Sequence, residues 1–263
     1  MRIIIVEVKN MRMVIKIGTS TLAHKTGKLN IRAFEKLTKV ISDLKNFGVE
    51  IILVSSGAIG MGAGKLGLLG KPEDIPTKQA AAAIGQCELM YMYDKYFGEY
   101  HHTVAQMLIT ANDFEDAEKH NNLQNTLARL LELGVLPIVN ENDTVSTAEL
   151  CIGDNDTLSA LVAIDAKADI LVLVSDIEGL YTCDPHKDKN AKLISVVENV
   201  DDVLSLGEDS VSVLGTGGMK TKLEAAKLVT RAGIDMVITN GGKPELLYDI
   251  AAGKETGTKF LGK

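Results

Sequence analysis

Residues 133–143 read Leu-Gly-Val-Leu-Pro-Ile-Val-Asn-Glu-Asn-Asp, a stretch that passes abruptly from apolar to polar. Its apolar part, Val135 to Val139, is continuous. A short continuous run of this kind is typical of a parallel strand that is buried on both faces of a sheet. The polar residues Asn140–Asp143 would then stand where that strand ends.

The same pattern recurs along the chain. Between the apolar runs lie helical patterns, such as the one that Asn30 is expected to cap and Gly48 to end. The sequence therefore predicts an α/β fold, a three-layer αβα sandwich with a mainly parallel central sheet, in a single domain over residues 1–263. The expected strands lie near residues 13–17, 49–54, 135–139, 169–174 and 234–239.

Polar or glycine residues follow each expected strand. Ligands of parallel sheets bind beyond the carboxyl ends of the strands, so these residues should share one rim. They are Lys16, Ser55–Gly57, Asn140–Asp143, Ser175-Asp176 and Asn240–Gly242.

A second polar cluster, Gly153-Asp154-Asn155-Asp156, opens the apolar segment that follows the rim residues of 140–143. Carboxylates and carboxamides at such places can hold a small polar ligand or its metal ion. Two ordinary loops would also account for them, because Asn and Asp are favoured in turns and helix caps. The spacing is not that of an EF-hand.

Composition excludes several classes of protein. The net charge is −7, with no concentration of Lys and Arg, which argues against a protein that binds nucleic acid through phosphates. A hydrophobic content of 46% excludes disorder, and no run is long enough for a transmembrane helix. The three cysteines form no Cys-x-x-Cys motif, which indicates a reducing cytosol, and there is no signal peptide pattern. We expect a cytoplasmic protein with no membrane and no nucleic-acid partner.

Two features of the first 70 residues suggest anion binding. Lys16 stands near the end of a buried strand, where an ammonium is costly without a partner, although an edge strand with a solvated lysine remains an alternative. Residues 55–67 are rich in Ser and Gly, and the backbone N–H groups of such a loop can bind phosphate or carboxylate. Their match to G-x-G-x-x-G is weak, and no P-loop is present.

A second glycine cluster, Gly215-Thr216-Gly217-Gly218-Met219, leads into a helix that carries Lys222. Glycines at a helix N-terminus make an anion site, and a lysine in the first turns adds charge. The alternative is a solvated helix face, since Lys220 and Lys227 are close. Two anion sites with two lysines on one rim suggest phosphoryl transfer.

A long helix is expected over residues 77–97. It contains Ala80–Ala83 and Gly85, small residues that permit close approach of another helix. Several tyrosines follow, which fits a subunit interface and ordinary core packing equally well.

These blocks resemble the glutamate 5-kinase group of the amino-acid kinase family, in the same order and over nearly the whole chain. The combination of Gly-Thr-Gly-Gly-Met with Gly-Asp-Asn-Asp is specific within that family. The blocks are Lys16–Ser20, Ser55–Ile59, Asn140–Asp143, Gly153–Asp156, Asp176–Tyr181 and Gly215–Met219.

The resemblance implies ATP-dependent phosphorylation of the side-chain carboxylate of L-glutamate to L-glutamyl 5-phosphate, the first step of proline biosynthesis, with Mg²⁺ on the ATP phosphates. It implies that Lys16 and Lys222 stabilise the moving phosphoryl group and that Asp156 orients them. The implied glutamate ligands are Ser56, Gly57, Asn140, Asp143 and Asn155. The implied ATP ligands are Lys16, Ser175, Asp176, Thr216, Gly217, Gly218, Met219 and Lys222.

The resemblance also implies an amino-acid substrate half over about residues 1–165 and a nucleotide half over about 166–263. Feedback inhibition by L-proline, a homodimer or homotetramer, and a glutamyl-phosphate reductase as partner are further expectations. Many members carry a C-terminal PUA domain, and this chain ends at Lys263 after the kinase fold. We expect catalysis without that domain, whereas the resemblance does not fix the oligomer or the strength of proline inhibition.

Two other functions stay open at this point. A related kinase could act on acetylglutamate or another small acid, but carboxylates near Asp143 suit a free amine better. A non-catalytic sensor of glutamate, proline or nucleotide has no need of Lys16, Lys222 and Asp156 together.

Overall fold

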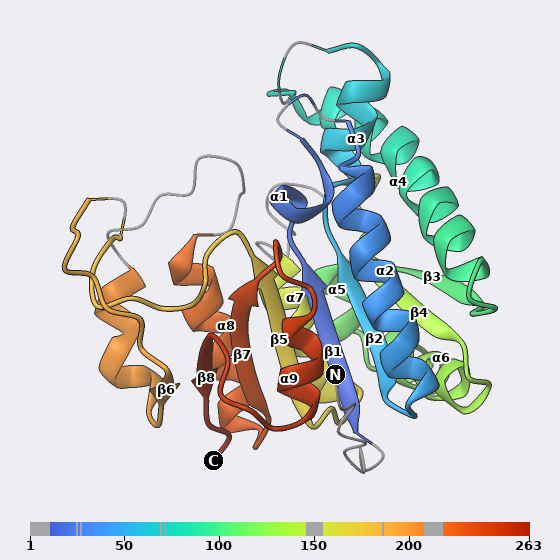
Figure 1. Cartoon of the computed structure of the whole chain (residues 1–263). Coiled ribbons are helices and arrows are strands. Elements are labelled where there is room, and N and C mark those ends of the chain that lie inside the picture. Colours follow the sequence, from blue (N-terminus) through green and yellow to red (C-terminus); the bar gives the residue numbers. More distant parts are fainter. Residues whose placement is uncertain are drawn as a thin grey trace.

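The computed structural model describes residues 11–24, 26, 28–68, 70, 72–145, 155–185, 187–207 and 218–263. These residues form one sheet with the strand order β3-β4-β2-β1-β5-β7-β8-β6 (Figure 1). The strands are β1 (Arg12–Ile17), β2 (Glu50–Ser55), β3 (Val104–Ile109), β4 (Leu136–Glu141), β5 (Ile170–Ser175), β6 (Val196–Val197), β7 (Asp235–Asn240) and β8 (Thr258–Phe260). The helices are α1 (Thr19–Leu22), α2 (Ile31–Asn46), α3 (Ala58–Lys65), α4 (Ile75–Gly98), α5 (Ala111–Glu115), α6 (Ala117–Glu132), α7 (Asn155–Asp165), η1 (Val200–Gly207), α8 (Met219–Arg231) and α9 (Leu246–Ala251).

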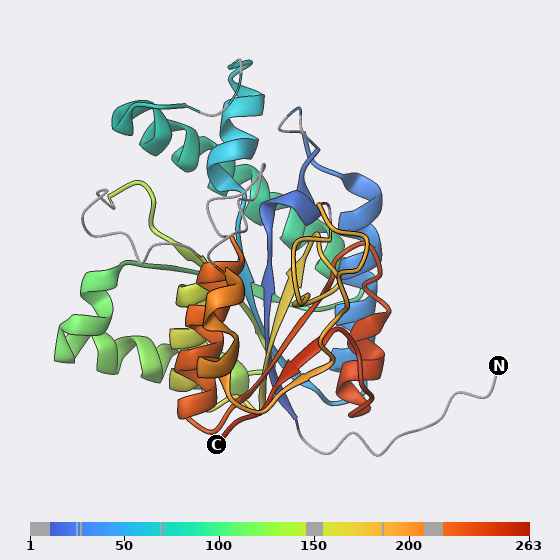
Figure 2. The same ribbon diagram turned by 90° about the vertical axis from the view of Figure 1, so that its left-hand side faces the viewer.

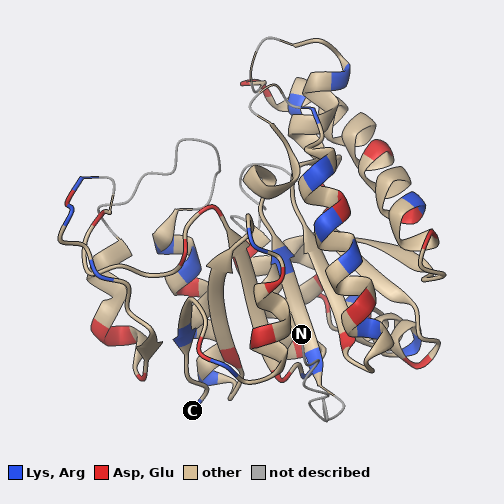
Figure 3. Cartoon of the chain, viewed as in Figure 1, with Lys and Arg blue, Asp and Glu red and all other residues tan. Residues whose placement is uncertain are grey.

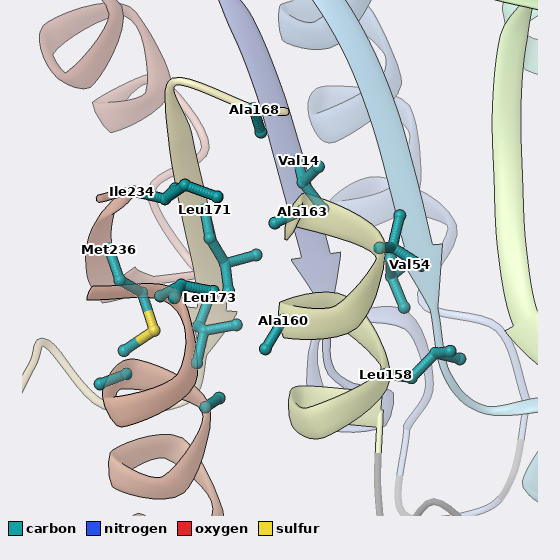
Figure 4. Close-up of a cluster of buried hydrophobic side chains, with 14 of the residues drawn as sticks. Val14, Val54, Leu158, Ala160, Ala163, Ala168, Leu171, Leu173, Ile234 and Met236 are labelled. Atoms are coloured by element: carbon teal, nitrogen blue, oxygen red, sulfur yellow. The ribbon is translucent and has the colours of Figure 1, made fainter. Parts of the chain in front are cut away.

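Helices cover both faces of the sheet, which confirms the predicted αβα sandwich (Figure 2). Side chains along the strands point alternately to the two faces of the sheet, and a hydrophobic core lies on each face. Val14 on β1 and Val54 on β2 pack with Leu158 of α7 on one face (Figure 4), in a core that also holds α6 and α8. Met13, Ile15 and Ile17 point to the opposite face, where α2, α4 and α9 pack. The same alternation fixes the direction of each polar residue at a strand end.

The five predicted strands are all present and run parallel to one another. The sequence pattern did not reveal β6 or β8, which have two and three residues, and β8 pairs antiparallel with β7. The strand expected at 135–139 ends two residues later, so Asn140 and Glu141 belong to β4 rather than to the loop after it. Both are buried. The candidate amide of Asn140 is thus held by the sheet itself.

Backbone hydrogen bonds continue past the strand ends and fix the rim. Gly18 N donates to the Val174 carbonyl at 3.2 Å, and Ser56 N donates to the Ile17 carbonyl at 3.2 Å. On the far side, Gly241 N donates to the Ser175 carbonyl at 2.7 Å. These bonds hold the carboxyl ends of β2, β1, β5 and β7 side by side. The predicted rim is therefore present at these four strands.

The glycine-rich segment after β2 corrects one sequence hypothesis. We expected residues 55–67 to form a loop, but Ala58–Lys65 form the helix α3, which packs against α4 beyond the carboxyl ends of the strands (Figure 1). A Cβ on Gly62 would lie 1.8 Å from the Ala81 carbonyl oxygen, and one on Gly85 would lie 1.8 Å from the Ala58 carbonyl oxygen. These glycines therefore serve close helix packing, as was expected for Gly85.

We predict that Gly62→Ala destabilises the fold. The added methyl group forces α3 and α4 apart, and overpacking of this kind costs about 1–3 kcal/mol, or roughly 5 °C in Tm. Gly98→Ala is the matched control, because Gly98 is also helical but nothing lies within 4 Å of its Cβ position. Thermal unfolding of both variants checks this: an unchanged Tm for Gly62→Ala contradicts tight packing of α3 on α4.

Figure 3 shows both signs interspersed along α2, which agrees with the absence of a basic stretch in the sequence. Among the described residues, no helix has the length and apolarity to cross a membrane.

Candidate active site

Asp156 is the centre of the site. It lies in the first turn of α7, fully buried, with its carboxylate between two lysines. Lys16 Nζ at the end of β1 is 2.6 Å from Asp156 Oδ1, and Lys222 Nζ in the first turns of α8 is 3.0 Å from Oδ2. The Thr221 hydroxyl also donates to Oδ2, at 3.0 Å. The predicted set of Lys16, Asp156 and Lys222 is thus one cluster.

Local structure explains this convergence. Lys16 follows Val14 by two residues on β1 and therefore faces the same side of the sheet, toward α7 and α8. Both helices begin at the rim, so their first turns bring Asp156 and Lys222 to the end of β1. The alternative of a solvated edge lysine is wrong, because β1 is central and Lys16 is 8% exposed.

The lysines keep Asp156 ionised. Burial acts to raise the pKa of its carboxyl group, but the charges and hydrogen bonds of Lys16 and Lys222 outweigh burial and lower that pKa to about 2. Two ammonium groups and one carboxylate leave the buried cluster with a formal charge of +1. Such a cluster attracts an anion, and a phosphoryl group is an anion of suitable kind.

Asn155, the residue before Asp156, points to the other half of the rim. Its Nδ2 atom donates to the Ser55 carbonyl at 2.7 Å and lies 2.9 Å from both Ser56 Oγ and Asn140 Oδ1. Asn155 and Asp156 are consecutive residues in the first turn of α7. Asn155 therefore contacts β2 and β4, and Asp156 contacts β1 and α8. Ser56, Asn140 and Asn155 therefore meet, as predicted.

Two residues of helix α4, Gln86 and Tyr93, contact the residues around this amide cluster. Gln86 Oε1 accepts from Asn140 Nδ2 at 2.8 Å, and Tyr93 Oη is 2.9 Å from Ser55 Oγ. Burial raises the pKa of the Tyr93 phenol, so its hydroxyl stays protonated. Thr221, Gln86 and Tyr93 were not singled out from the sequence, because no local pattern shows their long-range partners.

Gly57 begins α3 as its N-cap, with φ 103°, a left-handed conformation that glycine adopts without strain. No side chain caps the helix, so its first N–H groups remain as donors at the rim. Asp143 is partly buried two residues beyond β4.

On the nucleotide side, Ser175 is buried at the end of β5, and its hydroxyl donates to exposed Asp176 at 3.2 Å. Gly218 is the N-cap of α8, and Met219 is the first residue of the helix. Thr216 and Gly217, and likewise Gly153 and Asp154, lie outside the described residues. No group of three His, Cys, Asp or Glu side chains with metal-binding geometry occurs within the described part of the chain.

The sequence profile described as "Amino acid kinase family" matches residues 11–240. The chain belongs to the amino acid kinase family. Within this family it is similar to a glutamate 5-kinase of Clostridium perfringens (strain 13 / Type A), with 50% identity over 257 residues and 96% of both chains covered. A glutamate 5-kinase of Caldanaerobacter subterraneus is 51% identical over 252 residues, which cover 95% of this chain and 68% of that protein.

Solved structures share the fold of this chain at much lower sequence identity. A carbamate kinase from Giardia lamblia bound to AMP-PNP has a TM-score of 0.69 at 18% identity and covers 97% of this chain and 100% of its own. An isopentenyl phosphate kinase of T. acidophilum has a TM-score of 0.67 at 19% identity, with 95% and 100% covered. These likenesses support the fold alone.

Proposed function

We propose that this protein is a glutamate 5-kinase, which transfers the γ-phosphoryl group of ATP to the side-chain carboxylate of L-glutamate. The observation that carries the proposal is the buried Lys16–Asp156–Lys222 cluster at the rim. The 50% identity to glutamate 5-kinases over 96% of the chain supports the choice of acid.

In this reaction the protein positions reactants and neutralises charge. Both lysines lie within 3.0 Å of one carboxylate, so Asp156 holds their Nζ atoms at fixed places. Lys16 and Lys222 then stabilise the negative charge that spreads over the oxygens of the transferring phosphoryl group. Their preorganisation matters, because no reorganisation is needed as charge develops. A glutamate carboxylate oxygen is the nucleophile, and no covalent enzyme intermediate is required.

The acid binds on the β2 and β4 side of the cluster. The Ser56 hydroxyl, the amides of Asn140 and Asn155, and the free N–H groups that follow Gly57 offer hydrogen bonds to its carboxylates. Asp143 offers a carboxylate to its ammonium group. An acylated amine would lose that ion pair, which favours free glutamate over acetylglutamate.

ATP binds on the β5 and α8 side. Its ligands are Ser175, Asp176 and the segment that runs from Thr216 to Lys222, with Mg²⁺ carried on its phosphates. About residues 1–165 then hold the acid and about 166–263 the nucleotide, and the junction falls at the end of α7, whose first turn carries Asp156. Proline inhibition, a homodimer or homotetramer, a reductase partner and a cytoplasmic location remain predictions from the resemblance.

We predict acyl phosphate formation from L-glutamate. The purified protein is incubated with MgATP and L-glutamate, N-acetyl-L-glutamate or L-aspartate, and hydroxylamine traps the product as a hydroxamate. Hydroxamate from glutamate alone supports the proposal. Turnover of another acid in preference to glutamate points to a related kinase, and saturable glutamate or proline binding without turnover of any acid points to a sensor.

A further inference from the structure

Thr221, in the first turn of α8, is placed to donate to the Asp156 carboxylate alongside the two lysines. Its hydroxyl oxygen lies 3.0 Å from Asp156 Oδ2 and 2.9 Å from the carbonyl oxygen of Gly218. A hydroxyl group carries one proton, so it donates to one of these oxygens at a time. Asp156 is ionised, and a hydrogen bond to a charged acceptor is the stronger of the two. The proton of Thr221 therefore belongs mainly to Asp156.

The contact with Gly218 fixes the direction of this hydroxyl. Threonine has two favoured χ1 rotamers in a helix, because its Oγ1 can lie close to the carbonyl three or four residues earlier. Gly218 is three residues before Thr221 and is the N-cap of α8. The 2.9 Å distance between Thr221 Oγ1 and the Gly218 oxygen shows that Thr221 adopts this rotamer. The start of α8 thus holds the hydroxyl in place beside the Asp156 carboxylate.

The donors to Asp156 differ in stiffness. Lys16 and Lys222 reach the carboxylate through flexible four-carbon stems. Thr221 reaches it through a hydroxyl on its own Cβ, which has one side-chain rotamer to choose. Oδ2 lies beside both Thr221 and Lys222, and Oδ1 lies beside Lys16. The short, stiff donor therefore determines how the carboxylate is turned, and the carboxylate determines where the two ammonium groups lie.

We propose that Thr221 is a positioning residue of the reaction, whose hydroxyl orients Asp156 and, through it, the Nζ atoms of Lys16 and Lys222. The inference rests on the proposed function and adds a residue to it. Thr221 acts on the transfer step, so loss of its hydroxyl should lower kcat and leave the binding of both substrates almost unchanged. A threonine that binds the nucleotide would instead raise the KM for ATP.

Substitutions at Thr221 separate the hydroxyl from the rest of the side chain. Thr221→Val keeps the shape but has no donor, and its kcat should fall about 10-fold, the lower end of the loss expected for a hydrogen bond to a charged group. The loss stays at that end because both lysines still contact the carboxylate. Thr221→Ser keeps the donor, so its kcat should stay within about 3-fold of wild type. The KM values for ATP and L-glutamate should stay within about 3-fold in both variants.

Thr230→Val is the matched control. Thr230 is a buried residue near the other end of α8, and its hydroxyl donates to the Ala226 carbonyl at 2.8 Å. The substitution removes a hydroxyl bond to the same helix far from the rim, so kcat should stay within about 2-fold of wild type. Thermal melts check the folding of every variant. Thr221→Ala, which is smaller than valine, should lose as much kcat as Thr221→Val and carries the test if the valine variant fails to fold.

The outcomes are distinct. A folded Thr221→Val enzyme with wild-type kcat overturns the positioning role, and so does a Thr221→Ser enzyme as slow as Thr221→Val. A raised KM for ATP at unchanged kcat makes Thr221 a nucleotide ligand instead. If the wild-type protein prefers another acid to glutamate, the proposed function fails alone, and the kcat ratios measured with that acid still decide the role of Thr221. Without turnover of any acid, both proposals fail.

Discussion

Lys222→Met is expected to lower kcat about 10²- to 10³-fold, the usual cost of removing one preorganised group that stabilises transition-state charge. Lys222 Nζ lies 3.0 Å from Asp156, and only 6% of the residue is exposed. No other Lys or Arg among the described residues of α8 occupies this buried position. The KM for glutamate should change little, because Ser56 and Asn155 lie on the other side of the cluster.

Lys220→Met is the matched control. Lys220 lies two residues before Lys222 on the same helix but is exposed, so its loss removes a charge of the same sign from the same turn without touching the cluster. Its kcat should stay within about 2-fold of wild type, since exposed charges act weakly through water. Steady-state hydroxamate assays on folded proteins measure both. A Lys222→Met enzyme with wild-type kcat removes this lysine from the mechanism.

The residues of the rim could be predicted from the sequence, because the end of a parallel strand is marked by a local pattern. A continuous apolar run that ends in polar residues marks a parallel strand and its carboxyl end, so Lys16, Asn140 and Ser175 could be placed on one edge. That Lys16, Asp156 and Lys222 form a cluster came from family resemblance. Spacing alone could not bring together residues that are 140 and 66 positions apart.

What the sequence missed depends on tertiary contacts. Glycines at 60, 62 and 64 carry the same signal in a loop and in a tightly packed helix, and only contact with Ala81 on α4 distinguishes the two. Gln86 lies in an alanine-rich helix, and nothing in the local sequence indicates that its side chain contacts the site. Its partner Asn140 is 54 residues away. The strands β6 and β8, at one end of the sheet, are too short for any periodicity.

Asp156→Asn is expected to abolish measurable kinase activity and to lower the free energy of unfolding by about 3–5 kcal/mol. The substitution removes the only anion that the described residues show between Lys16 and Lys222, and breaking a buried ion pair leaves uncompensated charge. The two ammonium groups then repel each other and leave their fixed positions. Urea unfolding at pH 7 measures the loss, and the hydroxamate assay measures activity.

Asp249→Asn provides the comparison. Asp249 pairs with Lys254 at 2.7 Å, but both side chains are exposed, so its loss should cost less than about 1 kcal/mol. Similar destabilisation by the two substitutions contradicts a buried Asp156 that is held by two ion pairs.

Acid should narrow the difference between wild type and Asp156→Asn. The pKa of Asp156 is lowered from 3.8 to about 2 by folding, so the ionised carboxylate stabilises the native state fully above about pH 4. That contribution is lost as pH falls through about 2, because the protonated acid then resembles the amide. Urea midpoints at pH 7, 4, 3 and 2.5 should therefore converge in the acid range. A gap that stays constant down to pH 2.5 means that ionisation of Asp156 is not what holds the two lysines in place.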